Sequence, residues 1–165
     1  MANRIYGFEP VWRADARLLI LGSMPSVASL NQHFYYAHPR NCFWPMLAQI
    51  LGEALPLEIE DKKAMLHRHQ IALWDTAASC EREGSLDSAM RCVQANDFDA
   101  LYSHCPQIRN LLFNGAAAYQ LYRRLVARED ARFVYWRLPS TSPAYTMKYE
   151  EKRAAWARAL EEALK

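Results

Sequence analysis

Short apolar runs alternate with longer segments of helical periodicity along this chain. The apolar runs predict strands at residues 16–22, 70–75, 108–115 and 131–140. Each run is short and is bounded by Gly, Pro or polar residues, which is typical of a buried strand. A strand that is apolar on both faces belongs in a parallel sheet that is covered on both sides.

Helices are predicted at residues 42–52, 57–69, 97–104, 116–128 and 148–164. The first and last of these have apolar residues at helical spacing, and the second is a charged helix. Pro45 fits the first turn of the first helix, and Asn96 is expected to cap the third. Residues 76–95 are rich in turn formers and are expected to be a loop with one helical turn. The alternation predicts a single α/β domain over residues 1–165, with a mainly parallel, four-stranded sheet.

Composition excludes several classes of protein. The chain has 165 residues, of which 52% are apolar and 23% charged, as in globular proteins rather than disordered ones. No apolar run approaches the roughly 18 residues that span a bilayer, and the first ten residues contain no apolar signal core. We therefore expect a cytoplasmic protein without a membrane partner. The net charge of +2 excludes a polybasic nucleic-acid binder but allows a local basic cleft.

The cysteines and histidines give little support for a metal site. Cys42, Cys80, Cys92 and Cys105 form no C-x-x-C pair, so a zinc ribbon and a redox dithiol are not expected. His67 and His69 form an H-x-H pattern whose side chains point apart on a helix. A solvated helix end, where the dipole favours cations, is the preferred interpretation over a metal site.

The loops that follow the first and last predicted strands are the richest in chemistry, because ligands bind at the carboxyl ends of parallel strands. After the first strand, Tyr36 offers a flat face and Arg40 a cation, while Asn41 either serves a ligand or caps the next helix. After the last strand, residues 139–143 offer hydroxyl and N–H groups that either hold a phosphate or bond locally. No dinucleotide, P-loop or nucleophile-elbow motif is present, and a catalytic Cys42–His38 pair is disfavoured because Cys42 starts an apolar helix.

Several motifs together resemble the uracil-DNA glycosylase superfamily, and in particular its hypoxanthine-DNA glycosylase branch. They are GSMPS at 22–26, YAHPRNCFW at 36–44, LWDTAASCEREGSLDSAM at 73–90, NDF at 96–98, FNG at 113–115 and PSTSPA at 139–144. The resemblance implies a three-layer α/β/α sandwich around a four-stranded parallel sheet. These loops lack a lysine nucleophile, which implies a monofunctional enzyme. The chain also lacks the close cysteine pair of the iron–sulfur branches, so no cofactor is expected.

Carried onto this chain, the resemblance assigns roles to individual residues. Met24 stands where several branches place the Asp or Asn that activates water, so Asn41 is the expected catalytic residue. Tyr36 is expected to stack on the extruded base. Depending on register, Leu138 or Ser140 replaces the electrophilic His of the last loop. The other expected base-binding residues are Gly22, Ser23, Asp75 and Asn114, although Asp75 has the alternative of capping the next turn.

We expect DNA contacts from the same loops. The expected DNA-binding residues are Pro25, Ser26, Arg40, Ser140, Thr141, Ser142, Tyr145 and Lys148. Arg82 and Arg137 are expected to complete, with Arg40 and Lys148, a ring of basic side chains around the mouth.

The functional prediction is a monomeric DNA glycosylase that excises deaminated bases, hypoxanthine first and then uracil or xanthine, working on the nucleoid if the source is bacterial. Its partner is DNA that contains a deaminated base, which such enzymes flip out of the helix. Two alternatives stay open at this stage. One is a non-catalytic nucleic-acid-binding module of the same fold, and the other is a small α/β enzyme that acts on a free nucleoside.

Overall fold

A computed structural model describes residues 3–127 and 129–165. Its main sheet contains four parallel strands in the order β3-β2-β6-β7. The strands are β2 (Leu18–Gly22), β3 (Ile71–Asp75), β6 (Asn110–Asn114) and β7 (Val134–Leu138). Every residue of β2 and β3 is buried, as their uninterrupted apolar sequences predict. The predicted fold class is therefore confirmed.

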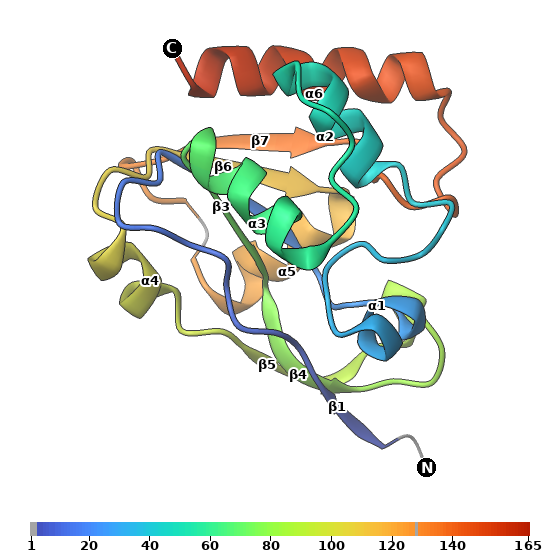
Figure 1. Cartoon of the computed structure of the whole chain (residues 1–165). Helices are drawn as coiled ribbons and strands as arrows, with labels where there is room; N and C mark the ends of the chain where they lie inside the picture. Colours follow the sequence, from blue (N-terminus) through green and yellow to red (C-terminus); the bar gives the residue numbers. More distant parts are fainter. Residues whose placement is uncertain (1–2, 128) are drawn as a thin grey trace.

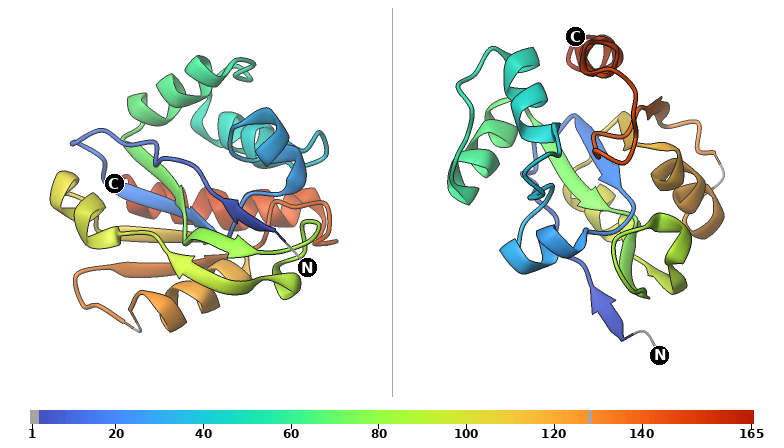
Figure 2. Two further views of the ribbon diagram at one scale, coloured as in Figure 1. Left: turned by 90° about the horizontal axis from the view of Figure 1, so that it is seen from below. Right: turned by 90° about the vertical axis from the view of Figure 1, so that its right-hand side faces the viewer.

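Helices cover both faces of this sheet. Figures 1 and 2 show α2 (Phe43–Leu51), α3 (Ile59–Arg68) and α6 (Tyr149–Ala163) over one face. The other face carries α4 (Phe98–His104) and α5 (Ala116–Leu125). The core between the layers is built from the strands and from large side chains such as Phe43, Phe113, Tyr122 and Trp156. The predicted end of α5 at Arg128 lies outside the described residues.

Three expectations about elements were wrong. Residues 76–95 contain two strands, β4 (Ala77–Glu81) and β5 (Arg91–Ala95), as well as the expected helical turn at Asp87–Ala89. With β1 (Arg4–Tyr6) they form an antiparallel sheet in the order β1-β4-β5. A short helix, α1 (Val27–Gln32), lies within the first loop. Asp97, not Asn96, caps α4, because its side chain accepts a hydrogen bond from Ala100 N at 3.1 Å.

The parallel register aligns the carboxyl ends of the strands. Gly22 pairs with Asp75, and Asn114 with Leu138. The chain turns from β3 into β4 at Thr76, so the second sheet begins at the same edge. All loops that carry motifs therefore meet at one end of the molecule. Among the described residues, no helix is both long enough and apolar enough to cross a membrane.

Candidate active site

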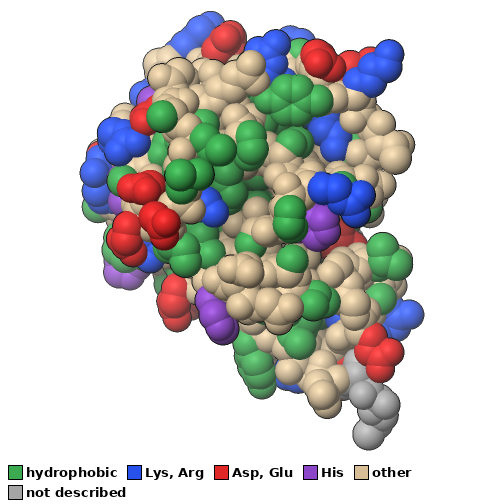
Figure 3. All heavy atoms as spheres, turned by 45° about the vertical axis from the view of Figure 1, so that its right-hand side comes forward, with side chains coloured by type: hydrophobic (Ala, Val, Ile, Leu, Met, Phe, Trp, Pro, Cys, Tyr) green, Lys and Arg blue, Asp and Glu red, His purple; other side chains and the backbone are tan. Residues whose placement is uncertain are grey.

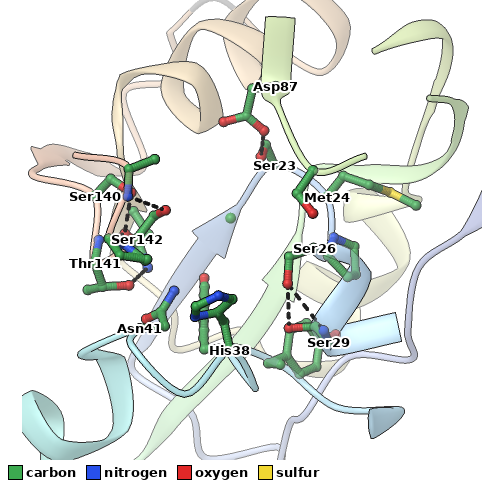
Figure 4. Close-up of a pocket in the computed structure, with 18 of the residues that line it drawn as sticks. Ser23, Met24, Ser26, Ser29, His38, Asn41, Asp87, Ser140, Thr141 and Ser142 are labelled. Carbon is green, nitrogen blue, oxygen red and sulfur yellow. Dashed lines mark hydrogen bonds between the residues drawn. The ribbon is translucent and has the colours of Figure 1, made fainter. Parts of the chain in front are cut away.

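A cavity of about 450 Å³ opens at the carboxyl ends of the parallel strands. Figure 4 shows Ser23 and Asp87 at one end of it, His38 and Asn41 at the other, and Ser140–Ser142 along one wall. Ser26 and Ser29 lie on the opposite wall (Figure 4). We refer to it below as the strand-end cavity.

The cavity contains a buried carboxyl group, that of Asp75. The side chain lies at the end of β3 and is only 4% exposed, and its Oδ2 has no hydrogen-bond partner among the described residues. Burial, followed by the charge of Asp87, raises the pKa of Asp75 to about 7, while the Arg82 charge acts in the opposite direction. Asn96 donates a hydrogen bond to the backbone oxygen of Asp75 at 2.7 Å. The backbone of Asp75 is thus held by Asn96, while the side-chain Oδ2 atom is available to accept a hydrogen bond from a ligand.

Tyr36 lies beside this carboxyl group. Its ring stacks on Phe43 with centroids 4.2 Å apart, and its hydroxyl group is buried without a partner that meets hydrogen-bond geometry among the described residues. Burial and the Asp75 charge raise the pKa of Tyr36, and the nearby Asn114 side chain partly opposes them. The phenol therefore stays neutral, and one face of its ring is already covered by protein.

Asn41 and His38 form the end of the cavity next to α2. The Asn41 Oδ1 atom accepts a hydrogen bond from Phe43 N at 3.0 Å, which fixes the orientation of the amide. The helix-capping alternative is not confirmed in its strict form, because Cys42 is the N-cap residue of α2 and Asn41, one residue earlier, binds only the first N–H of the helix in a local turn. Asn41 also lines the cavity. His38 Nδ1 accepts from Arg40 N at 3.0 Å, so in the neutral ring Nε2 carries the proton. Burial raises the pKa of the Cys42 thiol, whose Sγ contacts Thr141 O at 3.6 Å, so a nucleophilic Cys42–His38 pair is not formed.

The last loop is held by Asn114. Its amide donates to Thr141 Oγ1 at 3.0 Å and accepts from Thr141 N at 2.9 Å. Lys152, which is buried, donates to Ser142 O at 3.1 Å. Ser140 Oγ also accepts from Ser142 N at 3.1 Å, which is the local bonding that one interpretation of this loop expected. These hydrogen bonds hold residues 140–142 in a fixed position along one side of the cavity.

The first loop is tied to the segment that joins β4 to β5. Ser23 Oγ donates to Asp87 Oδ1 at 2.6 Å, and Val27 N donates to Ser85 Oγ at 2.9 Å. Met24 is buried in a small apolar cluster, and its side chain points away from the cavity (Figure 4). The Met24 side chain thus contributes no group that could hold water.

The structure brings most of the predicted residues together. Those that line the cavity are Gly22, Ser23, Pro25, Ser26, Tyr36, Arg40, Asn41, Asp75, Asn114, Ser140, Thr141 and Ser142. Tyr145 and Lys148 lie outside its lining. Arg82 was wrongly placed at the mouth, because it is buried and donates a hydrogen bond to the Pro25 carbonyl.

Sequence reasoning missed four polar side chains of the lining, those of Ser29, His38, Ser85 and Asp87. The signal for His38, Ser85 and Asp87 was their place inside the HPRN and GSLDS motifs, whereas Ser29 lies outside the quoted motifs. No group of three or more His, Cys, Asp or Glu side chains suited to a metal ion occurs among the described residues. The H-x-H motif lies at the end of α3, where His69 and Arg68 pair with Glu53.

Comparisons with known proteins agree with this geometry. The family model described as the uracil DNA glycosylase superfamily matches residues 10–165. The chain belongs to this superfamily. It is 33% identical over 156 residues to a hypoxanthine DNA glycosylase of Methanosarcina barkeri, covering 93% of this chain and 96% of that protein. A hypoxanthine DNA glycosylase of Methanosarcina acetivorans is 34% identical over 153 residues, or 91% and 94% of the two chains.

A solved structure extends the likeness to three dimensions. The solution NMR structure of a candidate uracil DNA glycosylase from Methanosarcina acetivorans superposes with a TM-score of 0.83 at 31% identity. The match covers 98% of this chain and 99% of the other. The resemblance to the DNA glycosylases of this superfamily is thereby confirmed.

Proposed function

We propose that this DNA glycosylase is monofunctional and excises deaminated bases, hypoxanthine first and uracil or xanthine after it. The observation that carries the proposal is the strand-end cavity itself. It places a fixed amide, Asn41, and a buried carboxyl group with a free oxygen, Asp75, in one cavity at the edge of the sheet. The names of the two Methanosarcina relatives support hypoxanthine as the first substrate.

Asn41 is proposed to position the attacking water. Its Oδ1 has two lone pairs, of which one accepts the Phe43 N–H, so the other is left for a water molecule. The water oxygen attacks C1′ of the deoxyribose as the C1′–N bond breaks. The base leaves with the bonding electrons, and the water loses a proton to solvent while the base gains one. Because a neutral amide is a poor base, the reaction depends on a good leaving group, and hypoxanthine is a better one than adenine.

Asp75 and Asn114 are proposed to recognise the edge of the flipped base. Hypoxanthine presents an N1–H donor beside its O6 acceptor, whereas N1 of adenine is an acceptor. An ionised Asp75 can accept from N1–H, and Asn114 Nδ2 retains a second hydrogen to donate to O6. Since Phe43 covers one face of Tyr36, the stacking role assigned to Tyr36 falls to its other face. No lysine lines the cavity among the described residues, which supports hydrolysis without a Schiff base.

The test is a single-turnover assay on a labelled duplex that contains one deoxyinosine, with alkali used to cleave the abasic product. Wild-type protein is expected to excise the base. Both Asn41→Ala and Asn41→Ser are expected to lose excision by about 100-fold or more. The serine variant is the matched control, because its hydroxyl oxygen preserves an acceptor for Phe43 N in the same kind of local turn.

The outcomes separate the candidate functions. If Asn41→Ser excises at the wild-type rate, Asn41 serves the helix and the catalytic assignment is wrong. If wild-type protein binds the duplex without releasing any base from a panel of deaminated substrates, the protein is a binding module of this fold. Release of hypoxanthine from the free nucleoside alone would identify a nucleoside hydrolase.

A further inference from the structure

Two buried cations lie behind the lining of the strand-end cavity. Arg82, which directly follows β4, is 4% exposed, and Lys152, near the start of α6, is 5% exposed. Neither forms an ion pair with a carboxylate among the described residues, whose ion pairs all lie elsewhere. A buried charge that lacks a counter-charge is costly to the folded state, so the charge of these two residues needs an explanation.

Each of the two cations is hydrogen-bonded to a backbone oxygen of a loop that lines the cavity. Arg82 Nη2 donates to the Pro25 carbonyl in the first loop, and Lys152 Nζ donates to the Ser142 carbonyl in the last loop at 3.1 Å. Pro25 and Ser142 both line the cavity. Figure 4 shows Ser142 and Ser26, the residue after Pro25, on opposite walls. The two positive charges therefore lie behind opposite walls, each one hydrogen bond away from the lining.

Holding a carbonyl oxygen does not require a charge, since the neutral amide of Asn96 holds the Asp75 carbonyl at 2.7 Å. Arg82 also uses little of its capacity, because its Nε and Nη1 are buried without a hydrogen-bond partner among the described residues. Within the same residues Lys152 Nζ has no second hydrogen bond, and it lies 5.5 Å from the centre of the Tyr145 ring. A purely structural role therefore accounts for one donor of each side chain but not for its charge.

The cavity lining itself supplies little positive charge. Among the described residues, Arg40 is the only Lys or Arg that lines it, whereas two carboxyl groups, those of Asp75 and Asp87, line it as well. When ionised, these carboxyl groups repel the phosphates on either side of a nucleotide that enters the cavity. Binding of a DNA strand across the opening therefore needs positive charge from behind the surface.

We propose that Arg82 and Lys152 are positioning residues that attract the DNA backbone onto the first and last loops from behind. Their charges act on the phosphates that flank the extruded nucleotide through one layer of protein backbone, where little water weakens the attraction. The phosphates in turn supply the counter-charge that both cations lack in the free protein. This inference rests on the proposed function, because it requires that the cavity receives a nucleotide still attached to its DNA strand.

The experiment removes each charge while it preserves a hydrogen-bond donor. Arg82→Gln and Lys152→Gln retain a side-chain N–H for the loop carbonyl, whereas Arg82→Lys and Lys152→Arg retain the charge. Fluorescence anisotropy measures affinity for undamaged and deoxyinosine duplexes over a range of salt concentrations. Each glutamine variant should bind both duplexes about threefold to tenfold more weakly at low salt, with the slope of log affinity against log salt reduced by about half a unit to one unit. The charge-preserving variants should recover the wild-type slope.

The matched control is Arg17→Gln. Arg17 lies before the amino end of β2, away from the cavity, and it donates to a backbone oxygen, that of Leu164, at 3.1 Å. The control variant therefore makes the same change of charge and keeps the same kind of donor, and its slope should equal that of wild type. Urea unfolding shows whether each variant is folded. If one glutamine variant does not fold, the same change at the other cation decides the question.

The outcomes separate charge from structure. A wild-type slope in both glutamine variants would overturn the proposal. Equal losses of binding in the glutamine and charge-preserving variants would also overturn it, because the loops would then need an exact side chain rather than a charge. If Arg82→Gln altered only the rate of base release, the Arg82 charge would serve Asp75 instead. Wild-type protein that binds duplex without releasing any base would refute the proposed function, and the salt slopes would still decide the role of the two cations.

Discussion

Gly22 occupies a position at which the structure leaves no room for a side chain. It pairs with Asp75 in the parallel register, and a Cβ atom there would collide with Asp75 Oδ1 and approach the Tyr36 hydroxyl to 2.9 Å. We expect Gly22→Ala to displace the carboxyl group and to reduce excision by about 100-fold, at a stability cost of about 1–3 kcal/mol. Single-turnover rates and urea unfolding measure the two effects.

Gly52→Ala supplies the matched control. Gly52 ends α2 with φ of 70°, so alanine strains the backbone there by about 1 kcal/mol, yet nothing lies within 4 Å of the added carbon. It should therefore lower stability without lowering the rate. A Gly22→Ala protein with wild-type excision would show that the Asp75 carboxyl group is not required where it lies.

Asp75 is the residue on which base selection is expected to depend. Asp75→Asn preserves the size of the side chain but adds a donor where N1–H of hypoxanthine needs an acceptor. Uracil presents the same pattern, with N3–H beside a carbonyl, so we expect Asp75→Asn to lower hypoxanthine and uracil excision together and to reduce the binding preference for deoxyinosine over deoxyadenosine duplexes. Tyr36→Ala should lower excision of both bases without changing that preference. Single-turnover rates and fluorescence anisotropy measure the two effects. An unchanged preference in Asp75→Asn would assign selection to stacking and shape.

The same carboxyl group should make stability depend on pH. Its pKa of about 7 in the folded protein exceeds the unfolded value of about 3.9, so the folded state binds the extra proton between these values. The stability of wild-type protein should therefore fall as pH rises through this window, whereas Asp75→Asn loses this dependence. The stability of the variant relative to wild type should increase by about 2–3 kcal/mol between pH 5 and pH 8, measured by urea unfolding. A constant difference would mean that Asp75 is not buried as described.

At the residue scale, sequence reasoning identified the groups that belong to recognisable motifs. Asn41 and Asp75 were both predicted, and both line the cavity. That the Asn41 amide both lines the cavity and binds the backbone N–H of Phe43 could not be predicted, because it depends on where α2 begins. Asp87 was missed because its role depends on a hydrogen bond to Ser23, which lies 64 residues away along the chain.

At the scale of elements, the buried strands were easy to predict and the second sheet was not. The strands β2 and β3 are apolar throughout, so burial alone identifies them. In contrast, β4 has the sequence AASCE and β5 has RCVQA, and neither alternates strictly between polar and apolar residues. The β4–β5 pairing also contains register irregularities. Such strands form because the tertiary structure supplies partners, and a single sequence does not show those partners.

The loop between β7 and α6 depends on one side chain from β6. Asn114→Ala removes both hydrogen bonds to Thr141 and leaves the buried Thr141 N–H without a partner. We expect a loss of about 1–3 kcal/mol in unfolding free energy and a clear fall in duplex binding. Asn114→Asp keeps the acceptor for Thr141 N and should recover part of the stability. Unfolding curves and fluorescence anisotropy provide the two measurements, and full binding by the alanine variant would show that the loop does not depend on Asn114.

At the scale of the whole molecule, charge does not mark the binding face. The chain carries only +2, and on the face shown in Figure 3 the basic and acidic side chains are interspersed rather than gathered in one stripe. Of the four cations expected to ring the mouth, Arg82 is buried and Arg40 lines the cavity. Arg137 and Lys148 are exposed outside the lining. We therefore expect few phosphate contacts, with Arg40 foremost.

Salt dependence of DNA binding tests this expectation. Each phosphate that a cation neutralises adds close to one to the slope of log affinity against log salt, so Arg40→Ala should reduce the slope by about one unit. The control is Arg132→Ala. Arg132 lies before the amino end of β7, whereas the cavity lies at the carboxyl ends of the strands, and it pairs with Asp130 at 2.7 Å. Its slope should equal that of wild type. Because a phosphate contact acts on any sequence, Arg40→Ala should weaken binding to deoxyinosine and undamaged duplexes equally. Loss confined to the deoxyinosine duplex, with the slope unchanged, would instead place Arg40 against the flipped base.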